Sequence, residues 1–349
     1  MIEYSERDEE ALERAIEEAR AEILVAGCGG AGGNAVSRIS EAGVEGIETV
    51  AVNTDAQDLL HASADHKTLI GREITGGRGT GNDPELGEEA AVDSRDLLEE
   101  SLCGKDMVFV TCGLGGGTGT GASPVVAEIA RSYGALTVGV VTLPMEVEGR
   151  RRSRNAGWGL KKLREVLDTI IIIPDDNIFK VGPDLSIGEA FEVADGVLTN
   201  IISGITELVT EPGLINLDFA DIRTTLQDGG ITQVGMGESD GEDRARNATE
   251  EALKSPLLET DLLSAEEALV SIKGDRKMTL EEAEAIVDRI SAGIGLGAQI
   301  NWGAYVSDGM INSIRVLAIV PGATSPWKNG LELEKKEANR RIDQDLESF

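Results

Sequence analysis

Short apolar runs alternate with helical patterns through the first half of the chain, and this alternation restricts the possible folds more than any other feature. The runs are continuous and rich in valine and isoleucine. Strands that are buried on both faces of a parallel sheet have this composition, and the helices between them are crossover connections. The expected strands are 22–28, 48–54, 106–112, 136–144 and 169–176, and the expected helices are 34–43 and 123–134. The sequence therefore predicts a doubly wound α/β domain that ends near residue 183.

A long apolar stripe follows this domain and predicts a helix that connects it to the rest of the chain. Ser186 and Glu189 have the spacing of a capping box, and apolar residues recur at helical intervals as far as Leu208. Pro212 and Gly213 end the pattern, so the helix spans about 35 Å at 1.5 Å per residue. Beyond it we expect strands at 231–237, 267–273, 298–306 and 313–321 and helices at 242–254 and 279–292. This mixture predicts a smaller α+β domain.

The chain has 349 residues, which is enough for two domains of ordinary size. The expected parts are an acidic helical extension over 1–20, the α/β domain over 21–183, the central helix and the loop after it over 184–223, the α+β domain over 224–327 and a flexible polar tail over 328–349.

The charge balance limits the partners that the chain can have. Its 63 acidic residues outnumber its 32 basic residues, which gives a formal net charge of −31. General binding to nucleic acid needs a basic surface, and so does adsorption to anionic lipid. No apolar run approaches the roughly 18 residues of a membrane span, and the acidic N-terminus is unlike a signal peptide. We expect a cytoplasmic protein without nucleic-acid binding or membrane insertion, whose acids are spread over the surface as in proteins from salt-rich habitats.

The residue types that carry nucleophilic or metal chemistry are scarce. The three cysteines lack metal-ligand spacing, and the two histidines are His61 and His66. An odd and sparse set of cysteines is typical of a reducing cytoplasm. We therefore expect neither a Ser-His nor a Cys-His catalytic system, and no residue is predicted as a dedicated metal ligand.

The first glycine-rich loop joins the first strand to a helix and reads GCGGAGGN, from Gly27 to Asn34. It contains the G-x-G-x-x-G pattern of dinucleotide-binding folds in the strand-turn-helix context that they require. Taken alone, it indicates NAD or FAD. Such folds place an acid at the end of the second strand, whereas this strand ends in Asn53-Thr54-Asp55, further along the chain than the pattern expects. An NAD(P)-binding oxidoreductase therefore fits poorly but stays open.

The second loop, GLGGGTGTGASP from Gly113 to Pro124, carries no charge and lacks the lysine of the usual phosphate loop. Two such loops at the carboxyl ends of strands in one sheet, each opening a helix, can face one phosphate chain. Backbone N–H groups supply the donors, and the hydroxyls of Thr118 and Thr120 add to them. A third glycine-rich segment, 75–82, either closes over the terminal phosphate or is a mobile surface loop.

Five segments, in this order and spacing, resemble the FtsZ family of cell-division GTPases in the tubulin superfamily, over about residues 20–325. They are GCGGAGGNA, AVNTDAQ, GLGGGTGTGASP, VTLPMEVEGRRR and NLDFADIR. The acidic composition resembles archaeal members from salt-rich habitats. The resemblance implies a GTP-binding domain, a long central helix and a smaller C-terminal domain. It also implies that the second loop binds GTP or GDP through backbone amides and a bound Mg²⁺ in place of a lysine.

The resemblance implies the residues of the two phosphate-binding loops. They are Gly29, Gly30, Gly33 and Asn34 in the first loop and Gly115, Gly116, Gly117, Thr118, Gly119, Thr120 and Gly121 in the second.

The remaining nucleotide contacts are also implied by the resemblance. Glu148 would bind the ribose and Arg152 the phosphates, although a solvated charged loop explains both residues equally simply. Phe191 would stack on the guanine base, and Asp195 would accept hydrogen bonds from its ring N–H and its amine. Without the resemblance, Phe191 is a core residue. Asp175 stands where the family usually has an asparagine that contacts the base, so that a carboxyl replaces an amide.

Three polar residues after the central helix, Asn216, Asp218 and Asp221, complete the predicted catalytic set. Asp218 and Asp221 are three residues apart, so both carboxylates can share one face of a helical turn. They can equally be the charged first turn of a short helix that begins near residue 219. In the family this loop enters the next subunit's nucleotide pocket, where the aspartates polarise the attacking water or help to hold the cation. The resemblance therefore implies a site that is split between subunits.

The predicted function is a GTP-hydrolysing, filament-forming cytoskeletal protein of cell division at the mid-cell ring. The expected partners are further copies of the chain, head to tail, and a membrane-anchoring division protein that binds the C-terminal tail. A tubulin-like filament for cell shape or DNA segregation shares these motifs and stays open. A paralogue that binds GTP without hydrolysing it is disfavoured by the presence of Asp218 and Asp221.

Overall fold

The computed structural model describes residues 20–176, 187–211, 213–255, 257–258, 262–295, 297–307 and 309–322. The predicted N-terminal extension up to residue 19, the start of the capping box at Ser186 and the predicted tail over 328–349 therefore lie outside the described residues. Within the described part, no helix is long and apolar enough to cross a membrane.

Six parallel strands form the first part of the sheet, in the order β3-β2-β1-β4-β5-β6. Their bounds are β1 Ile23–Cys28, β2 Ile47–Asn53, β3 His66–Leu69, β4 Met107–Gly113, β5 Leu136–Leu143 and β6 Thr169–Pro174. Strands β1 and β5 are buried along their whole length. The chain order reverses between the neighbours β1 and β4, as in doubly wound folds. The predicted fold class is confirmed.

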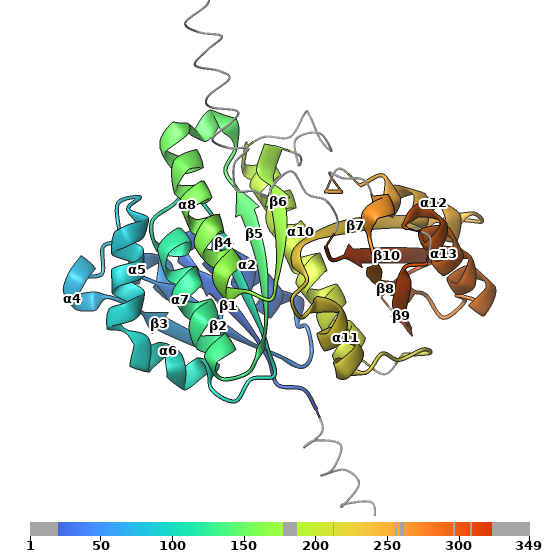
Figure 1. The fold of residues 1–349 in the computed structure, drawn as a ribbon, viewed down its shortest axis with the longest axis horizontal. Coiled ribbons are helices and arrows are strands. Elements are labelled where there is room, and N and C mark those ends of the chain that lie inside the picture. The colour runs from blue at the N-terminus through green and yellow to red at the C-terminus, as the bar shows by residue number, and fades with distance from the viewer. Residues whose placement is uncertain are drawn as a thin grey trace, which may run out of the picture.

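The second part of the sheet continues the first through β7 (Gly230–Asp240), which Figure 1 shows reaching from one part of the molecule to the other. The first three residues of β7 pair in parallel with β6, and the rest pairs antiparallel with β10 (Ser313–Val320). Strand β8 (Glu267–Gly274) lies between β10 and the parallel edge strand β9 (Gln299–Val306). The two parts therefore share one hydrogen-bonded sheet of ten strands.

Helices cover both faces of this sheet (Figure 1). In the first part they are α2 Gly29–Ala42, α3 Ala56–His61, α4 Arg72–Thr75, α5 Pro84–Asp93, α6 Arg95–Leu102, α7 Thr118–Ser132 and α8 Arg150–Val166. They are followed by α10 Ile187–Thr210, α11 Phe219–Leu226, α12 Arg244–Leu253 and α13 Leu280–Gly293, with short 3₁₀ turns η1 Glu146–Glu148 and η2 Leu262–Ser264. Helices α5 to α8 share an aliphatic core with one face of the first sheet part, and α2, α10 and α11 share another with the opposite face.

Helix α10 packs against both parts of the sheet, as its predicted stripe requires. Its buried residues Ile201 and Ile205 belong to the same core as Val138 of β5 and Leu317 of β10. At its C-terminal end the side chain of Glu207 accepts a 2.6 Å hydrogen bond from Lys273 of β8. The predicted central helix is therefore present and joins the two parts.

The helices after the glycine-rich loops begin earlier than predicted. Helix α2 starts at Gly29 and α7 at Thr118, so much of each loop forms the first turns of a helix. Glycine is a weak helix former, but here neighbouring backbones leave no room for a side chain. A Cβ at Gly119 would lie 2.8 Å from the carbonyl oxygen of Cys28, and one at Gly121 would overlap that of Pro84. Close packing therefore selects glycine in these turns.

Candidate functional site

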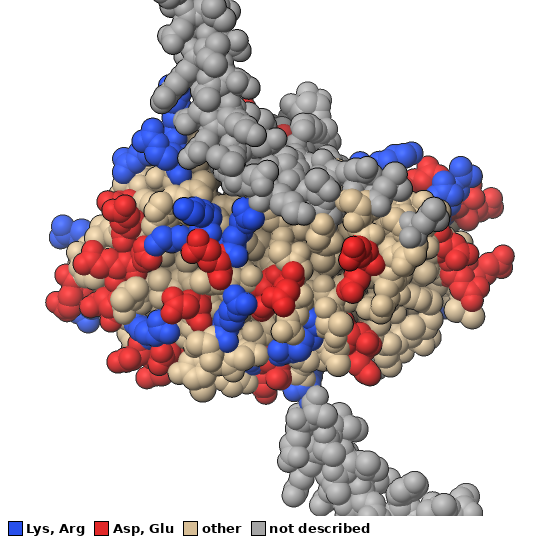
Figure 2. Space-filling view, viewed as in Figure 1, with Lys and Arg blue, Asp and Glu red and all other residues tan. Residues whose placement is uncertain are grey.

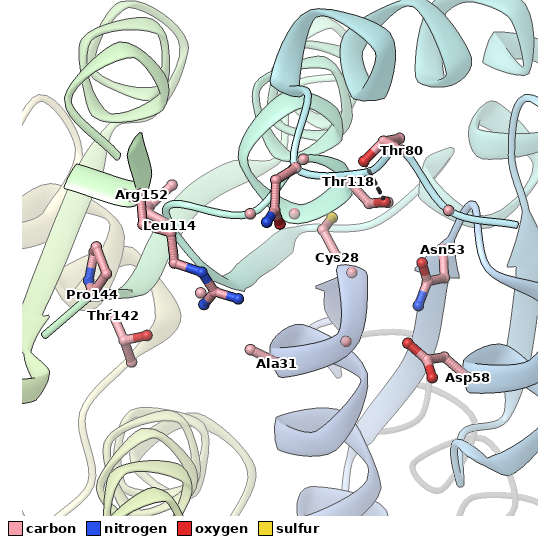
Figure 3. A pocket seen from close by; sticks show the side chains of 18 of the residues that line it. Cys28, Ala31, Asn53, Asp58, Thr80, Leu114, Thr118, Thr142, Pro144 and Arg152 are labelled. Carbon is pink, nitrogen blue, oxygen red and sulfur yellow. Dashed lines mark hydrogen bonds between the residues drawn. The ribbon is translucent and has the colours of Figure 1, made fainter. Parts of the chain in front are cut away.

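A cavity of about 440 Å³ opens where the carboxyl ends of β1, β4 and β5 meet the first turns of α2 and α7. Figure 3 shows side chains from several separate segments converging on it. It lies where the strand order reverses between β1 and β4. Open α/β sheets bind their ligands at this position, because the loops on either side diverge and leave a crevice.

The N-termini of α2 and α7 both face this cavity without a side-chain cap. Among the described residues, no side chain accepts a hydrogen bond from their first turns, and neither first turn holds an acid. Two neighbouring helices differ, because the carboxylates of Asp55 and Asp83 accept from the first turns of α3 and α5. The uncapped N–H groups and the positive ends of two helix dipoles form a site for an anion.

The first predicted loop borders two adjacent hollows, of which one is the cavity. Gly29 and Gly30 line the cavity. Gly29 has a φ of 71°, and a Cβ there would lie 2.7 Å from the backbone nitrogen of Gly119, so the two loops touch. Gly33 and Asn34 do not line the cavity but an adjacent hollow of about 310 Å³ beside α3.

In the second predicted loop, Gly116, Gly117, Thr118 and Gly119 line the cavity, while Gly115, Thr120 and Gly121 do not. The Thr120 hydroxyl accepts a 2.9 Å hydrogen bond from the backbone N–H of Gly115. It therefore holds the loop in shape, which differs from its predicted role as a ligand contact.

The third glycine-rich segment lines the same cavity from Arg78 to Asn82. The Thr80 hydroxyl lies 3.5 Å from that of Thr118, as Figure 3 shows. On its outer side, Asn155 of α8 donates to the carbonyl oxygen of Asn82 at 3.0 Å and to that of Gly115 at 3.1 Å. Of the two interpretations of this segment, the structure favours the one in which it closes the cavity.

Glu148 and Arg152 form an ion pair at the cavity wall, with 2.5 Å between Nη1 and Oε2. The other carboxylate oxygen of Glu148 accepts from the backbone N–H of Met145 at 2.9 Å. Figure 3 shows the Arg152 guanidinium projecting into the cavity. Both residues are therefore placed and oriented, and the solvated loop considered from sequence is instead η1 and the first turn of α8.

Asp175 and Asp195 line the cavity between β6 and α10. Asp195 accepts a hydrogen bond from Nε of Arg38 at 3.2 Å, and its pKa is raised by burial, which the Arg38 charge only partly offsets. Burial and the nearby carboxylates raise the pKa of Asp175 to about 7. Phe191 belongs to α10, but its side chain lies outside the described residues.

The predicted catalytic residues lie elsewhere, beyond the C-terminal end of α10. Asn216, Asp218 and Asp221 are exposed, and none of them lines the cavity. Asp218 precedes α11, and its backbone N–H donates to the Asp221 carboxylate at 3.3 Å. The local geometry thus agrees with the charged first turn of a short helix, but leaves the outer sides of both carboxylates open to solvent.

Sequence reasoning missed the residues that β2 and α3 bring to the cavity, namely Asn53, Asp55 and Asp58. Figure 3 shows the side chains of Asn53 and Asp58 on the α3 side of the cavity. Asn53 is the last residue of β2, which pairs directly with β1. A polar residue at the carboxyl end of a strand beside the phosphate loop is the signal that identifies it.

Comparison with known proteins agrees with this geometry. Residues 22–183 match the GTPase domain of the Tubulin/FtsZ family, and residues 230–324 match the C-terminal domain of the FtsZ family. The chain is 53% identical to cell division protein FtsZ 1 of Pyrococcus horikoshii, over 93% of this chain and 87% of that protein. The chain belongs to the FtsZ family. It is a GTPase of the tubulin superfamily and a filament-forming protein of cell division, as predicted.

Other FtsZ-family relatives extend over nearly the whole chain. Cell division protein FtsZ of Methanothermobacter thermautotrophicus is 48% identical, over 99% of this chain and 93% of that protein. An FtsZ dimer from M. jannaschii superposes with a TM-score of 0.87 at 47% identity, covering 91% of this chain and 93% of that one. CetZ1 of Haloferax volcanii superposes with a TM-score of 0.76 at 25% identity, covering 92% and 99%. The oxidoreductase alternative has no support from these matches.

Proposed function

We propose that the cavity binds GTP and that a second copy of the chain, stacked head to tail, completes the hydrolytic site. The observation that carries this proposal is the pair of uncapped N-termini, α2 and α7, that face one cavity. Their backbone N–H groups would hold the phosphates, and Arg152 would add a positive charge beside them. Glu148 would accept from the ribose hydroxyls, and Asp195 from the ring N–H and amine of guanine.

The residues of the cavity fit a magnesium ion only together with the nucleotide. Among the residues that the structure describes, no group of three or more His, Cys, Asp or Glu is placed to hold a metal. Mg²⁺ commonly binds through phosphate oxygens and water with one or two carboxylates, which needs no cage made of protein alone. The ion would neutralise phosphate charge, and the carboxylates of Asp218 and Asp221 from the next copy would approach it.

Within one chain, the cavity and the predicted catalytic aspartates lie too far apart to form one site, so a second copy is required. Asp195 reaches the cavity from the first half of α10, whereas Asp218 and Asp221 follow the C-terminal end of this helix. From Asp195 to its end at Thr210, helix α10 rises by 15 residues, which corresponds to about 22 Å at 1.5 Å per residue. One chain therefore cannot bring both sets of residues to the same phosphate. A head-to-tail neighbour can, since the loop after α10 lies at the surface.

The test is GTP hydrolysis per chain as a function of protein concentration, in high KCl with Mg²⁺, for the wild type and Asp218→Ala. We expect a threshold concentration below which hydrolysis vanishes, and a loss of at least about 100-fold in the variant with GTP binding retained. Glu284→Ala, which removes one exposed carboxylate from α13, is the control and should keep wild-type activity. A rate per chain that stays constant down to low concentration would show a self-contained monomeric GTPase instead.

We further propose that the tail over 328–349 binds a membrane-anchoring partner that places the filament at the mid-cell ring. The support is the resemblance, together with isolated apolar residues amid charge near the end of the tail. The net charge of −31 makes nucleic acid an unsuitable partner.

A further inference from the structure

One acid in the wall of the cavity has no hydrogen-bond partner for its inner oxygen. Asp175 directly follows β6, and the residue is 8% exposed. Its Oδ1 atom is buried and makes no hydrogen bond within the described part of the chain. Buried polar atoms nearly always have a partner, so an orphaned oxygen that lines a ligand cavity is expected to find its partner in the ligand.

The surroundings of Asp175 oppose a negative charge there. Three nearby carboxylates repel a negative charge on Asp175, namely those of Glu148 in η1, the adjacent Asp176 and Asp195 in α10. Among the described residues of this region, Arg152 is paired with Glu148, and Arg38 is paired with Asp195. Burial and this like charge together raise the pKa of Asp175 to about 7, so the protonated and the ionised carboxyl are both populated near neutral pH.

This step rests on the proposed function, in which the base is guanine. The hydrogen-bonding groups of guanine then require the proton on the Asp175 carboxyl. The base offers hydrogen-bond donors only at its ring N–H and its exocyclic amine, while O6 and N7 are acceptors. Asp195, which has the Arg38 guanidinium beside it, is the carboxylate suited to the two donors. A second carboxyl at the same base then faces acceptors, and it can bind them only by donating its own O–H.

We propose that Asp175 enters the nucleotide complex as the neutral carboxylic acid and donates a hydrogen bond to an acceptor atom of the guanine base. Guanine nucleotide binding is then coupled to the protonation of one residue and weakens as the pH rises above neutral. An asparagine at this position would donate from its amide without titrating. The aspartate of this chain therefore adds pH dependence to base recognition.

The test is the dissociation constant of GDP measured by calorimetry between pH 6.5 and 8.5, for the wild type and Asp175→Asn. For the wild type we expect binding to weaken by roughly tenfold or more over this range, because each pH unit above the pKa lowers the protonated fraction by up to tenfold. Asp175→Asn keeps the shape and a donor, so its affinity should change little and should exceed that of the wild type at pH 8.5. Titration of GDP itself affects both proteins equally.

The matched control is Asp288→Asn, which removes an exposed acid of α13 that does not line the cavity and should keep the pH dependence of the wild type. Asp175→Ala should bind weakly at every pH, since it lacks the donor. Equal pH profiles for the wild type and Asp175→Asn would overturn the proposal. Absence of GDP binding at any pH by all the proteins would instead contradict the nucleotide site itself.

Discussion

Two adjacent glycines of the phosphate loop are required for different reasons. A Cβ at Gly117 would overlap the hydroxyl of Thr80 and lie 2.8 Å from backbone atoms of Asp83. A Cβ at Gly116 would meet nothing within 4 Å, although Gly116 lines the cavity. Neither residue has a positive φ. The fold therefore requires glycine at 117, whereas at 116 only a ligand requires it.

Alanine at each position separates these two requirements. Gly117→Ala should destabilise the protein by about 1–3 kcal/mol, the usual cost of overpacking. Gly116→Ala should leave the unfolding temperature of the nucleotide-free protein unchanged and weaken GDP binding by tenfold or more, because its methyl group enters the space of the phosphates. Thermal unfolding without nucleotide, followed by a GDP titration, measures both effects. Equal destabilisation by the two substitutions would show that the fold itself also requires glycine at position 116.

At the level of residues, the sequence reveals those members of the site that stand in a recognisable loop. Gly29 and Gly116 were predicted because glycine runs between a strand and a helix are typical of phosphate binding. Asn53 was not predicted, because its place at the cavity depends on which strands become neighbours. Thr80 lies in the segment 75–82, for which closure over the phosphate was one of two interpretations. Thr120 was assigned to the ligand because a sequence does not show that its hydroxyl bonds to Gly115.

At the level of elements, the burial of a helix or strand determines whether it can be predicted from the sequence. Most strands were predicted to within about two residues, because strands covered on both faces form continuous apolar runs. The exposed strand β3 was not predicted, and β7 extends three residues beyond its predicted end. Helix α8 was missed, since its first residues, Arg150 to Arg154, have the composition of a solvated loop. Its helical state depends on Leu160 and Leu163, which pack into the core beside α7. Tertiary packing therefore outweighs local composition in this element.

One buried arginine joins three elements of the C-terminal part. Arg244, in the first turn of α12, is 5% exposed and donates to Asp275 after β8 at 2.9 Å and to Glu282 of α13 at 2.7 Å. Burial alone would raise the pKa of Asp275, but the hydrogen bond and charge of Arg244 outweigh it, so this pKa is lowered. The hydrogen bond from Arg244 likewise lowers the pKa of Glu282.

These lowered pKa values fix the direction of the pH dependence. A carboxyl that is more acidic in the folded state contributes stability above its unfolded pKa of about 4, and this contribution is lost as the pH falls further. Arg244→Met should cost about 3–5 kcal/mol near pH 7, because it leaves two carboxylates without their cation. The difference from the wild type should shrink between pH 5 and pH 3. Urea denaturation across this range tests it, and a pH-independent difference would contradict the ion-pair explanation.

At the level of the whole molecule, the acidic residues occur throughout the sequence. Figure 2 shows acidic side chains spread over the whole visible face, with basic side chains between them. This agrees with the prediction from composition that the acids are dispersed. With a net charge of −31, the excess negative charges on the surface repel one another. A head-to-tail neighbour adds a second net charge of the same size. Both folding and assembly therefore work against electrostatic repulsion.

Salt should relieve this repulsion in both processes. The Debye length falls from about 10 Å at 0.1 M to about 3 Å at 1 M, so repulsion between separated surface charges is largely screened at high salt. We expect the unfolding temperature to rise by several degrees and the threshold concentration for GTP hydrolysis to fall as KCl increases from 0.1 to 2 M. Choline chloride at equal ionic strength should act in the same way, whereas sucrose at equal osmolality should not lower the threshold. If sucrose reproduces the effect of KCl on both quantities, exclusion of cosolute from the surface rather than screening of the −31 charge governs assembly.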